Sequence, residues 1–339
     1  MDKNGNGAIK LKKEKNVLIS VRNLVKHYPL RGGVFSRQVG KVKAVDNVSF
    51  QVSRGETIGL VGESGCGKST LARTMIRLEE PTSGSVYFRG KNLTSLSRKE
   101  FFPIRREIQM IFQDPYSSLN PRMTVGELIM DPLTVHRIGN RRMRSAKVDD
   151  LLVRVGLSPD MKSRYPHEFS GGQRQRVGVA RALTLEPKLV IADEPVSALD
   201  VSVRSQVLNL LVELKKEFDL TYIFISHDLS VVEYISDTLA IMYLGKIMEI
   251  GPSMDIYRNP RHPYTRVLLE AIPVPDPSRK KKKSMVKGEP PSAVNPPPGC
   301  SFHPRCPFSI EECSKVIPHL EDTGSERLHL CACIRKDEI

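Results

Sequence analysis

Residues Gly62–Thr70 read GESGCGKST and match the phosphate-binding loop (P-loop) pattern G-x-x-x-x-G-K-[ST] in full. An apolar, strand-like run precedes the motif, and the helical pattern LARTMIRL follows it. Glycines let such a loop fold tightly, so that its N–H groups and the helix N-terminus point at the β and γ phosphates of a nucleotide. Lys68 then adds a positive charge, and the Ser69 hydroxyl holds Mg²⁺. We therefore predict that nucleotide is bound by Gly62, Glu63, Ser64, Gly65, Cys66, Gly67, Lys68, Ser69 and Thr70.

The segments around the P-loop predict an α/β fold. Residues 17–30 (VLISVRNLVKHYPL) alternate apolar and polar positions, and residues 43–62 repeat strand-like runs separated by turns, which indicates an antiparallel β layer. We assign a loop to residues 31–42 between them. Strands alternate with helices after Lys68, which is typical of a parallel sheet covered on both faces. The predicted fold is thus α/β, with an antiparallel β layer, a parallel-sheet core and an inserted helical subdomain at about residues 114–178.

Composition divides the chain into four parts, since 339 residues suffice for one large core and an accessory module. We predict a basic N-terminal tail at residues 1–17, a nucleotide-binding domain at 18–270, a Pro- and Lys-rich linker at 271–299 and a small cysteine-containing tail module at 300–339. No stretch approaches the roughly 20 apolar residues that span a bilayer, and the start lacks the apolar run of a signal peptide. We expect a chain that neither crosses a membrane by itself nor is secreted.

The formal net charge of +14 suits nucleic acid, an anionic membrane surface or phosphate ligands, and charge alone does not choose among them. Part of this charge is local, because Lys280–Lys283 follow Arg279 in a Pro-rich stretch. We interpret this run as a solvated linker, with a lipid or nucleic-acid contact as the alternative.

Two acids end a buried apolar run at Leu189–Pro195, which reads LVIADEP. Ionised carboxylates in an apolar setting are costly without a partner, and a metal ion and a water together provide one. We expect Asp193 to support Mg²⁺, usually through a water, and Glu194 to polarise the water that attacks the γ phosphate. Taken without the P-loop, such a pair could instead cap a helix or form a salt bridge.

Phe169–Arg176 read FSGGQRQR, which resembles the signature sequence of the ABC ATPase family. The resemblance implies an ABC-type P-loop NTPase in which two subunits pair head to tail. The signature of each subunit then closes over the γ phosphate bound to the other. A helix N-terminus with small residues suits an anion. The residues that would serve the partner's nucleotide are Ser170, Gly171, Gly172 and Gln173.

Other positions follow the order of the family's motifs. Gln113 in IFQDP resembles the glutamine that meets Mg²⁺ and the attacking water, and His227 in IFISHD resembles the switch histidine that contacts the γ phosphate. Tyr28 in KHYPL resembles the aromatic residue on which adenine stacks, although a lone tyrosine more often packs in a core. The resemblance thus implies catalysis by Glu194, His227 and Gln113, and Mg²⁺ held by Ser69, Gln113 and Asp193. The SALD loop at the dimer interface would be Ser197, Ala198, Leu199 and Asp200.

The C-terminal part resembles one branch of this family. Residues 261–277 (RHPYTRVLLEAIPVPDP) and 299–306 (GCSFHPRC) are similar to the ATPases of oligopeptide and dipeptide importers, and the N-terminal half is similar to the F-type of their two ATPases. This implies an ATPase coupled to peptide transport on the cytoplasmic face of the inner membrane. Its partners would be a second, non-identical D-type ATPase, two transmembrane permeases and an extracytoplasmic substrate-binding protein.

Three alternative functions are compatible with parts of the sequence. A soluble ABC ATPase acting on nucleic acid or ribosomes fits the charge, but the single P-loop and the lack of sustained heptads disfavour it, and we expect no nucleic-acid partner. A module that uses ATP only as a switch is disfavoured by the presence of Glu194. An importer of another cargo, such as nickel or oligosaccharide, stays open because the permeases and the binding protein hold the cargo.

Five of the six cysteines lie in the final 40 residues, and clustering in a cytosolic chain indicates metal rather than disulfides. The spacings C-x5-C and C-x6-C, then 19 residues, depart from the C-x2-4-C pairs of common zinc sites. The resemblance implies a structural iron-sulfur cluster, [4Fe-4S], with His329 four residues before the last ligand. Zinc is the second candidate and free or oxidised thiols the third. The cluster ligands would be Cys300, Cys306, Cys313 and Cys333, with Cys331 as the alternative to Cys333.

Overall fold

The computed structural model describes residues 16–32, 37–272 and 288–339. Most of the predicted basic N-terminal tail and the Lys280–Lys283 run lie outside the described residues. The chain forms two compact units, which are described one at a time. The first unit comprises Met1–Ser53, Ile58–Ser95 and His227–Ile339, and the second comprises Arg54–Thr57 and Leu96–Ser226.

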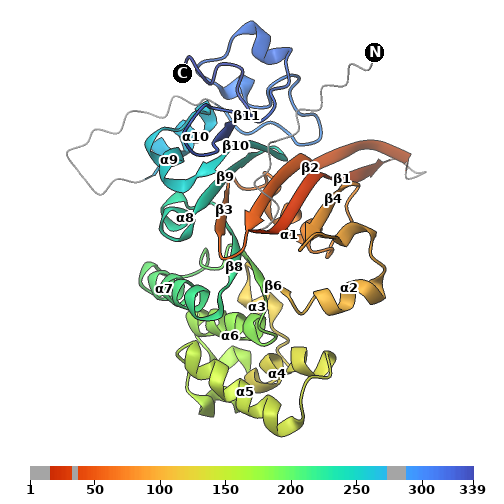
Figure 1. The fold of residues 1–339 in the computed structure, drawn as a ribbon, viewed down its shortest axis with the longest axis vertical. Helices are drawn as coiled ribbons and strands as arrows, with labels where there is room; N and C mark the ends of the chain where they lie inside the picture. The colour runs from red at the N-terminus through yellow and green to blue at the C-terminus, as the bar shows by residue number, and fades with distance from the viewer. Residues whose placement is uncertain (1–15, 33–36, 273–287) are drawn as a thin grey trace, which may run out of the picture. The chain divides into compact units, whose positions relative to one another are not determined.

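An antiparallel sheet leads the first unit, as the alternating pattern predicted (Figure 1). Its order is β2-β1-β4-β5, and β1 pairs with both β2 and β4 in antiparallel register. Apolar side chains of β1 are buried at Leu18, Ile19, Val21 and Leu24. The bounds are Val17–Gly32 for β1, Arg37–Ser53 for β2, Ser83–Phe88 for β4 and Lys91–Asn92 for β5.

The loop assigned to residues 31–42 was wrong in extent. β1 continues to Gly32 and β2 begins at Arg37, with these two residues paired across the hairpin. Glycine-rich sequence is typical of a turn, but cross-strand hydrogen bonds satisfy the backbone here and extend the two strands.

The rest of the first unit contains the P-loop and the C-terminal tail. β3 (Thr57–Val61) runs parallel to β9 (Thr238–Tyr243), which pairs in antiparallel register with β10 (Lys246–Pro252). The tail adds two short strands beyond β10, β12 (Leu330–Cys331) and then β11 (Glu321–Asp322) (Figure 1). The tail therefore shares a compact unit with the P-loop. The helices are α1 (Lys68–Met75), η2 (Leu93–Ser95), α8 (Leu229–Ile235), α9 (Ser253–Arg258), α10 (Pro263–Glu270), η5 (His303–Arg305) and η6 (Glu311–Ser314).

The second unit contains the predicted parallel strands. β8 (Thr221–Ser226), β7 (Leu189–Asp193) and β6 (Ile108–Ile111) lie side by side in that order and in parallel register. Every residue of β7 and β8 is buried, as expected for parallel strands covered on both faces. The helices are α2 (Arg98–Ile104), α3 (Pro115–Ser118), α4 (Val125–Val135), α5 (Arg141–Arg154), η3 (Pro159–Ser163), η4 (Pro166–Glu168), α6 (Gly171–Leu183) and α7 (Val201–Phe218).

Helices α3 to α6 occupy the region of the predicted helical subdomain, and α6 extends it to Leu183. Capping boxes begin α4 and α6: Thr124 with Glu127, and Ser170 with Gln173. In the part of the chain that the structure describes, no helix is at once long and apolar enough to cross a bilayer.

Candidate nucleotide site and cysteine-lined cavity

The P-loop connects β3 to α1 and is packed closely against two other strands. A Cβ atom at Gly62 would lie 2.1 Å from the Met242 carbonyl oxygen of β9, and one at Gly67 would lie 2.0 Å from the Ala44 carbonyl oxygen of β2. Gly67 also has a φ of 106°, a left-handed conformation that favours glycine. Glycine at these positions lets the loop backbone fold as the predicted phosphate cradle requires.

Lys68 lies against the loop that it follows. Its ammonium donates to the Gly62 carbonyl at 2.7 Å and to the Glu63 carbonyl at 3.0 Å, and the side chain is buried. Burial raises the pKa of the Cys66 thiol, which keeps it in its neutral form. Cys66 is part of the P-loop.

Glu194 and Gln113 come together in the second unit. Gln113 Nε2 donates to Glu194 Oε2 at 3.0 Å. The two residues follow the adjacent parallel strands β6 and β7, whose carboxyl ends meet at one edge of the sheet. Asp193 is the last residue of β7 and is fully buried.

The backbone of Glu194 is in the left-handed region, with a φ of 46°. A non-glycine residue held there costs on the order of 1–3 kcal/mol, and such strain clusters at functional sites. The Glu194 N–H donates to the Ile225 carbonyl at 3.0 Å, and the Ser197 hydroxyl donates to the Glu194 carbonyl at 3.1 Å. These bonds hold the carboxylate in the geometry that places it next to Gln113.

The signature residues form the start of α6. The Ser170 hydroxyl accepts from the Gln173 N–H at 3.3 Å, and the Gln173 side-chain oxygen accepts from the Ser170 N–H at 3.0 Å. Ser170 and Gly171 are exposed, whereas Gly172 is buried, and a Cβ atom there would lie 2.3 Å from Val203 Cγ1 of α7. Ser170 and Gly171 are thus accessible at the helix N-terminus, whereas Gly172 is not.

Three further predicted positions are placed as follows. Ser197–Asp200 connect β7 to α7, with Ala198 and Asp200 exposed. His227 is exposed directly after β8. The Tyr28 hydroxyl donates to Glu79, and Lys26 Nζ lies 4.9 Å from the centre of the Tyr28 ring. The roles given to these residues stay predictions.

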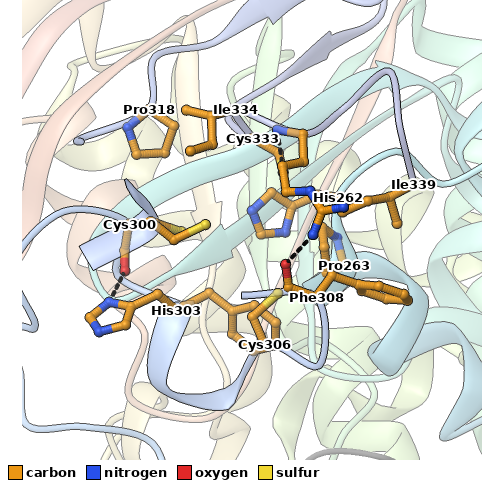
Figure 2. A pocket seen from close by; sticks show the side chains of 13 residues that line it. His262, Pro263, Cys300, His303, Cys306, Phe308, Pro318, Cys333, Ile334 and Ile339 are labelled. Carbon is orange, nitrogen blue, oxygen red and sulfur yellow. Dashed lines mark hydrogen bonds between the residues drawn. The ribbon is translucent and has the colours of Figure 1, made fainter. Parts of the chain in front are cut away.

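Four of the C-terminal cysteines line one cavity, and these are Cys300, Cys306, Cys313 and Cys333 (Figure 2). All four are free thiols. Burial raises the pKa values of Cys300 and Cys306 to about 11, against the lowering effect of backbone N–H donors and with a smaller upward contribution from neighbouring cysteines. Over residues 16–32, 37–272 and 288–339, no group of three or more His, Cys, Asp or Glu side chains is arranged to hold a metal ion.

Cys331 and His329 do not line this cavity. Cys331 is fully buried in β12, opposite Glu249 of β10, and does not line the cavity. His329 Nε2 lies 2.7 Å from Glu249 Oε1, so its ring makes a buried hydrogen bond to β10. The structure thus separates Cys331 from the other four, a choice that the sequence left open.

Two known protein families match separate stretches of the chain. The family described as "ABC transporter" matches residues 45–197, and "Oligopeptide/dipeptide transporter, C-terminal region" matches residues 248–313. The chain is 53% identical over 319 residues to the oligopeptide transport ATP-binding protein AppF of Bacillus subtilis (strain 168), covering 93% of this chain and 96% of that protein.

Two solved structures are also similar. cbiO1 from Clostridium perfringens, part of the ABC transporter complex cbiONQ, has a TM-score of 0.61 at 28% identity and covers 72% of this chain and 92% of its own. The ATP-binding cassette MJ0796, a dimer in a post-hydrolysis state bound to ADP and Pi, has a TM-score of 0.62 at 28% identity and covers 70% of this chain and 99% of its own.

Proposed function

We propose that this chain, which belongs to the ATP-binding subunits of ABC transporters in the oligopeptide and dipeptide branch, energises the import of peptides across a membrane. Members of this family are ATPases coupled to transport, and they use ATP and Mg²⁺. The observation that carries the catalytic assignment is the 3.0 Å hydrogen bond between Gln113 and Glu194 at the carboxyl ends of adjacent strands.

Hydrolysis requires a water to attack the γ phosphorus while the bond to the bridging oxygen between the β and γ phosphates breaks. We assign phosphate binding to the N–H groups of Gly62–Thr70 and to the Lys68 ammonium. Glu194 orients the attacking water and accepts its proton, and Gln113 orients both the carboxylate and the water. His227 contacts the γ phosphate.

Mg²⁺, when bound with ATP, neutralises charge on the phosphate oxygens. We assign its protein contacts to Ser69, at the start of α1, to Gln113 and, through a water, to Asp193. Asp193 supports this assignment because it is a fully buried acid at the end of β7.

Family membership implies membrane permeases as partners, together with a second ATPase. We propose that Ser170–Gln173 complete the nucleotide site of that second, D-type subunit, while Ser197–Asp200 cross the interface between the two. The exposed N-terminus of α6 supports this assignment. The chain would lie on the cytoplasmic face of the inner membrane, held by two permeases, and an extracytoplasmic protein would deliver the peptide.

The catalytic assignment is tested by Glu194→Gln in the assembled transporter. An amide cannot accept the proton, so phosphate release should fall on the order of 10²–10⁴-fold while ATP still binds and holds the dimer closed. Glu213→Gln is the matched control, because Glu213 is exposed on α7 and its turnover should equal that of the wild type. Wild-type turnover in the Glu194 variant would reject the role.

We also propose that the cysteine-lined cavity holds a [4Fe-4S] cluster with a structural role. Four free cysteines on the wall of one cavity supply the ligand type and number of such a cluster. Within the described residues these side chains are not arranged around a metal ion, so cluster binding would have to draw them together. The tail has few regular elements of its own, and a bound cluster would add stability to a segment of this size. Cys300, Cys306, Cys313 and Cys333 would bind the iron atoms as thiolates.

Anaerobic purification followed by iron, sulfide and zinc assays and a visible spectrum tests this assignment. We expect a coloured protein with about four irons and four sulfides, and loss of both in Cys306→Ser. Cys331→Ala should keep the cluster, since that side chain does not line the cavity. A colourless protein with one zinc, or one with no metal, would overturn the proposal.

A further inference from the structure

Arg305 of the C-terminal tail makes a two-pronged ion pair with the P-loop. Its Nη1 lies 2.9 Å from Glu63 Oε2, and its Nη2 donates to Glu63 Oε1 at 3.0 Å. The Arg305 side chain is only 10% exposed and that of Glu63 is 24% exposed. Nη1 also reaches the Tyr243 hydroxyl at 3.3 Å. A guanidinium bound to a carboxylate by both prongs is fixed in orientation as well as in distance.

The backbone of Arg305 is held in the segment that carries two of the cavity cysteines. Its N–H donates to the Phe302 carbonyl at 3.0 Å, and the Cys306 N–H donates to the His303 carbonyl at 3.2 Å. The His303 N–H in turn donates to the Cys300 carbonyl at 3.0 Å. Arg305 therefore lies in the same turn as Cys300 and Cys306, which line the cavity.

Phe302 anchors this segment in the first unit. Its ring is fully buried and lies 5.4 Å from the Tyr243 ring, 5.2 Å from the Tyr264 ring and 5.9 Å from the His262 ring, measured between centroids. Aromatic contacts of this kind fix the position of the segment relative to α10 and β9. The guanidinium is thus presented to the P-loop from a rigid support.

Every polar group of Glu63 is engaged. Its carboxylate binds Arg305, its N–H donates to the Tyr264 hydroxyl at 3.0 Å, and its carbonyl accepts from the Lys68 ammonium at 3.0 Å. The contacts form a continuous path from the tail, through Glu63, to the lysine that is assigned to the phosphates. Arg305 also neutralises a carboxylate that stands in the loop where a polyanion binds.

We propose that Arg305 is a positioning residue for the P-loop, through which the cysteine-bearing tail sets the affinity of the loop for nucleotide. The proposal rests on the nucleotide-binding role of Gly62–Thr70. In Arg305→Ala, the Glu63 carboxylate stays without its counter-charge and repels the phosphates, and the loop loses one of its restraints.

Titration of the full-length chain with the non-hydrolysable analogue AMP-PNP tests the proposal by calorimetry. Arg305→Ala should raise the Kd about tenfold, which corresponds to about 1.4 kcal/mol. Glu63→Gln should raise it less, because the repelling charge is gone. The double variant should bind more tightly than Arg305→Ala alone, a coupling that a loss of folding in the tail would not produce.

Lys315→Ala is the matched control, since Lys315 is an exposed cation of the same tail that pairs with Glu311. Its Kd should equal that of the wild type. Iron content, measured on each variant, should stay at the wild-type level in Arg305→Ala. An unchanged Kd in Arg305→Ala, or strictly additive effects in the double variant, would overturn the proposal. Absence of AMP-PNP binding to the wild type would instead reject the nucleotide site itself.

Discussion

Replacing Glu249 should release the C-terminal tail from β10. The Glu249 side chain is fully buried, and its Oε1 accepts from the Arg261 N–H at 2.8 Å and lies 2.7 Å from His329 Nε2. Its Oε2 accepts from the His262 N–H at 3.0 Å. Glu249 also stands opposite Cys331 in the pairing of β10 with β12. One carboxylate therefore holds the tail strand and the start of α10 together.

The free energy by which each Glu249 variant destabilises the docked tail follows from the number of buried donors that lose their acceptor. Glu249→Ala removes the acceptor of all three, and each buried donor left unsatisfied costs about 1–3 kcal/mol, so the loss is at least about 3 kcal/mol. Glu249→Gln keeps the shape but places an NH₂ group where one oxygen accepts, so that at least one buried donor is unsatisfied at a cost of about 1–3 kcal/mol. We therefore expect the tail to be most stable in the wild type, less stable in Glu249→Gln and least stable in Glu249→Ala.

Acid should weaken the same contact. Burial alone would raise the pKa of Glu249, but hydrogen bonds from His329 and from the backbone N–H groups of Arg261 and His262 hold it below the ordinary value of 4.5. Because the pKa is lower in the folded than in the unfolded chain, this contribution to stability is complete above about pH 4.5 and is lost as the pH falls through the folded value.

Hydrogen exchange followed by mass spectrometry measures this effect locally. The amide of Ala332 donates to the Met248 carbonyl at 2.8 Å and reports on the docking of β12. Its peptide should exchange at least 100-fold faster in Glu249→Ala, as expected for about 3 kcal/mol. Glu321→Ala, which removes an exposed ion pair to Lys336, is the control and should change little. Equal protection in Glu249→Ala and the wild type would refute the reasoning.

Three further predictions concern the second unit and its partners. The ATPase rate per molecule of the purified subunit should rise with concentration and with added D-type subunit, because Ser170–Gln173 act on the partner's nucleotide; full activity of a demonstrated monomer at high dilution would contradict this. Ser170→Ala should lower the free energy of unfolding by about 1 kcal/mol and Ser170→Gly by only a few tenths, because the α6 cap is lost, and urea denaturation measures the difference. A cysteine at Met123 should crosslink to a cytoplasmic permease loop, since this segment follows Gln113 and leads into the helical subdomain; crosslinks found only at β2 would argue against that docking surface.

Most of the predictions from the sequence rest on short, contiguous motifs. Gly62–Thr70 and Asp193–Glu194 are contiguous, and the residue types that their chemistry needs stand at fixed spacing. The antiparallel layer and the buried parallel strands were also readable, because apolar periodicity is a local property. The same local reasoning failed at residues 31–42, where strand pairing decides the structure.

Contacts between distant segments were not predictable from the sequence. Arg305 and Glu63 are 242 residues apart, and nothing in HPRC or in GESG indicates that they meet. The buried pair of Glu249 with His329 joins residues 80 apart. The family resemblance favoured Cys333 with Cys331 as the alternative, and the structure distinguishes them because Cys331 belongs to β12 and does not line the cavity. Each of these contacts depends on how the tail packs, which is a tertiary property.

Peptide uptake by the assembled transporter in sealed vesicles tests the central claim most directly. Uptake of a labelled oligopeptide should require ATP on the side of this subunit, and Glu194→Gln in this chain should reduce it on the order of 10²–10⁴-fold, in step with phosphate release. Glu213→Gln should transport at the wild-type rate. ATP hydrolysis at the wild-type rate with no movement of any peptide, or undiminished uptake with Glu194→Gln, would contradict the account.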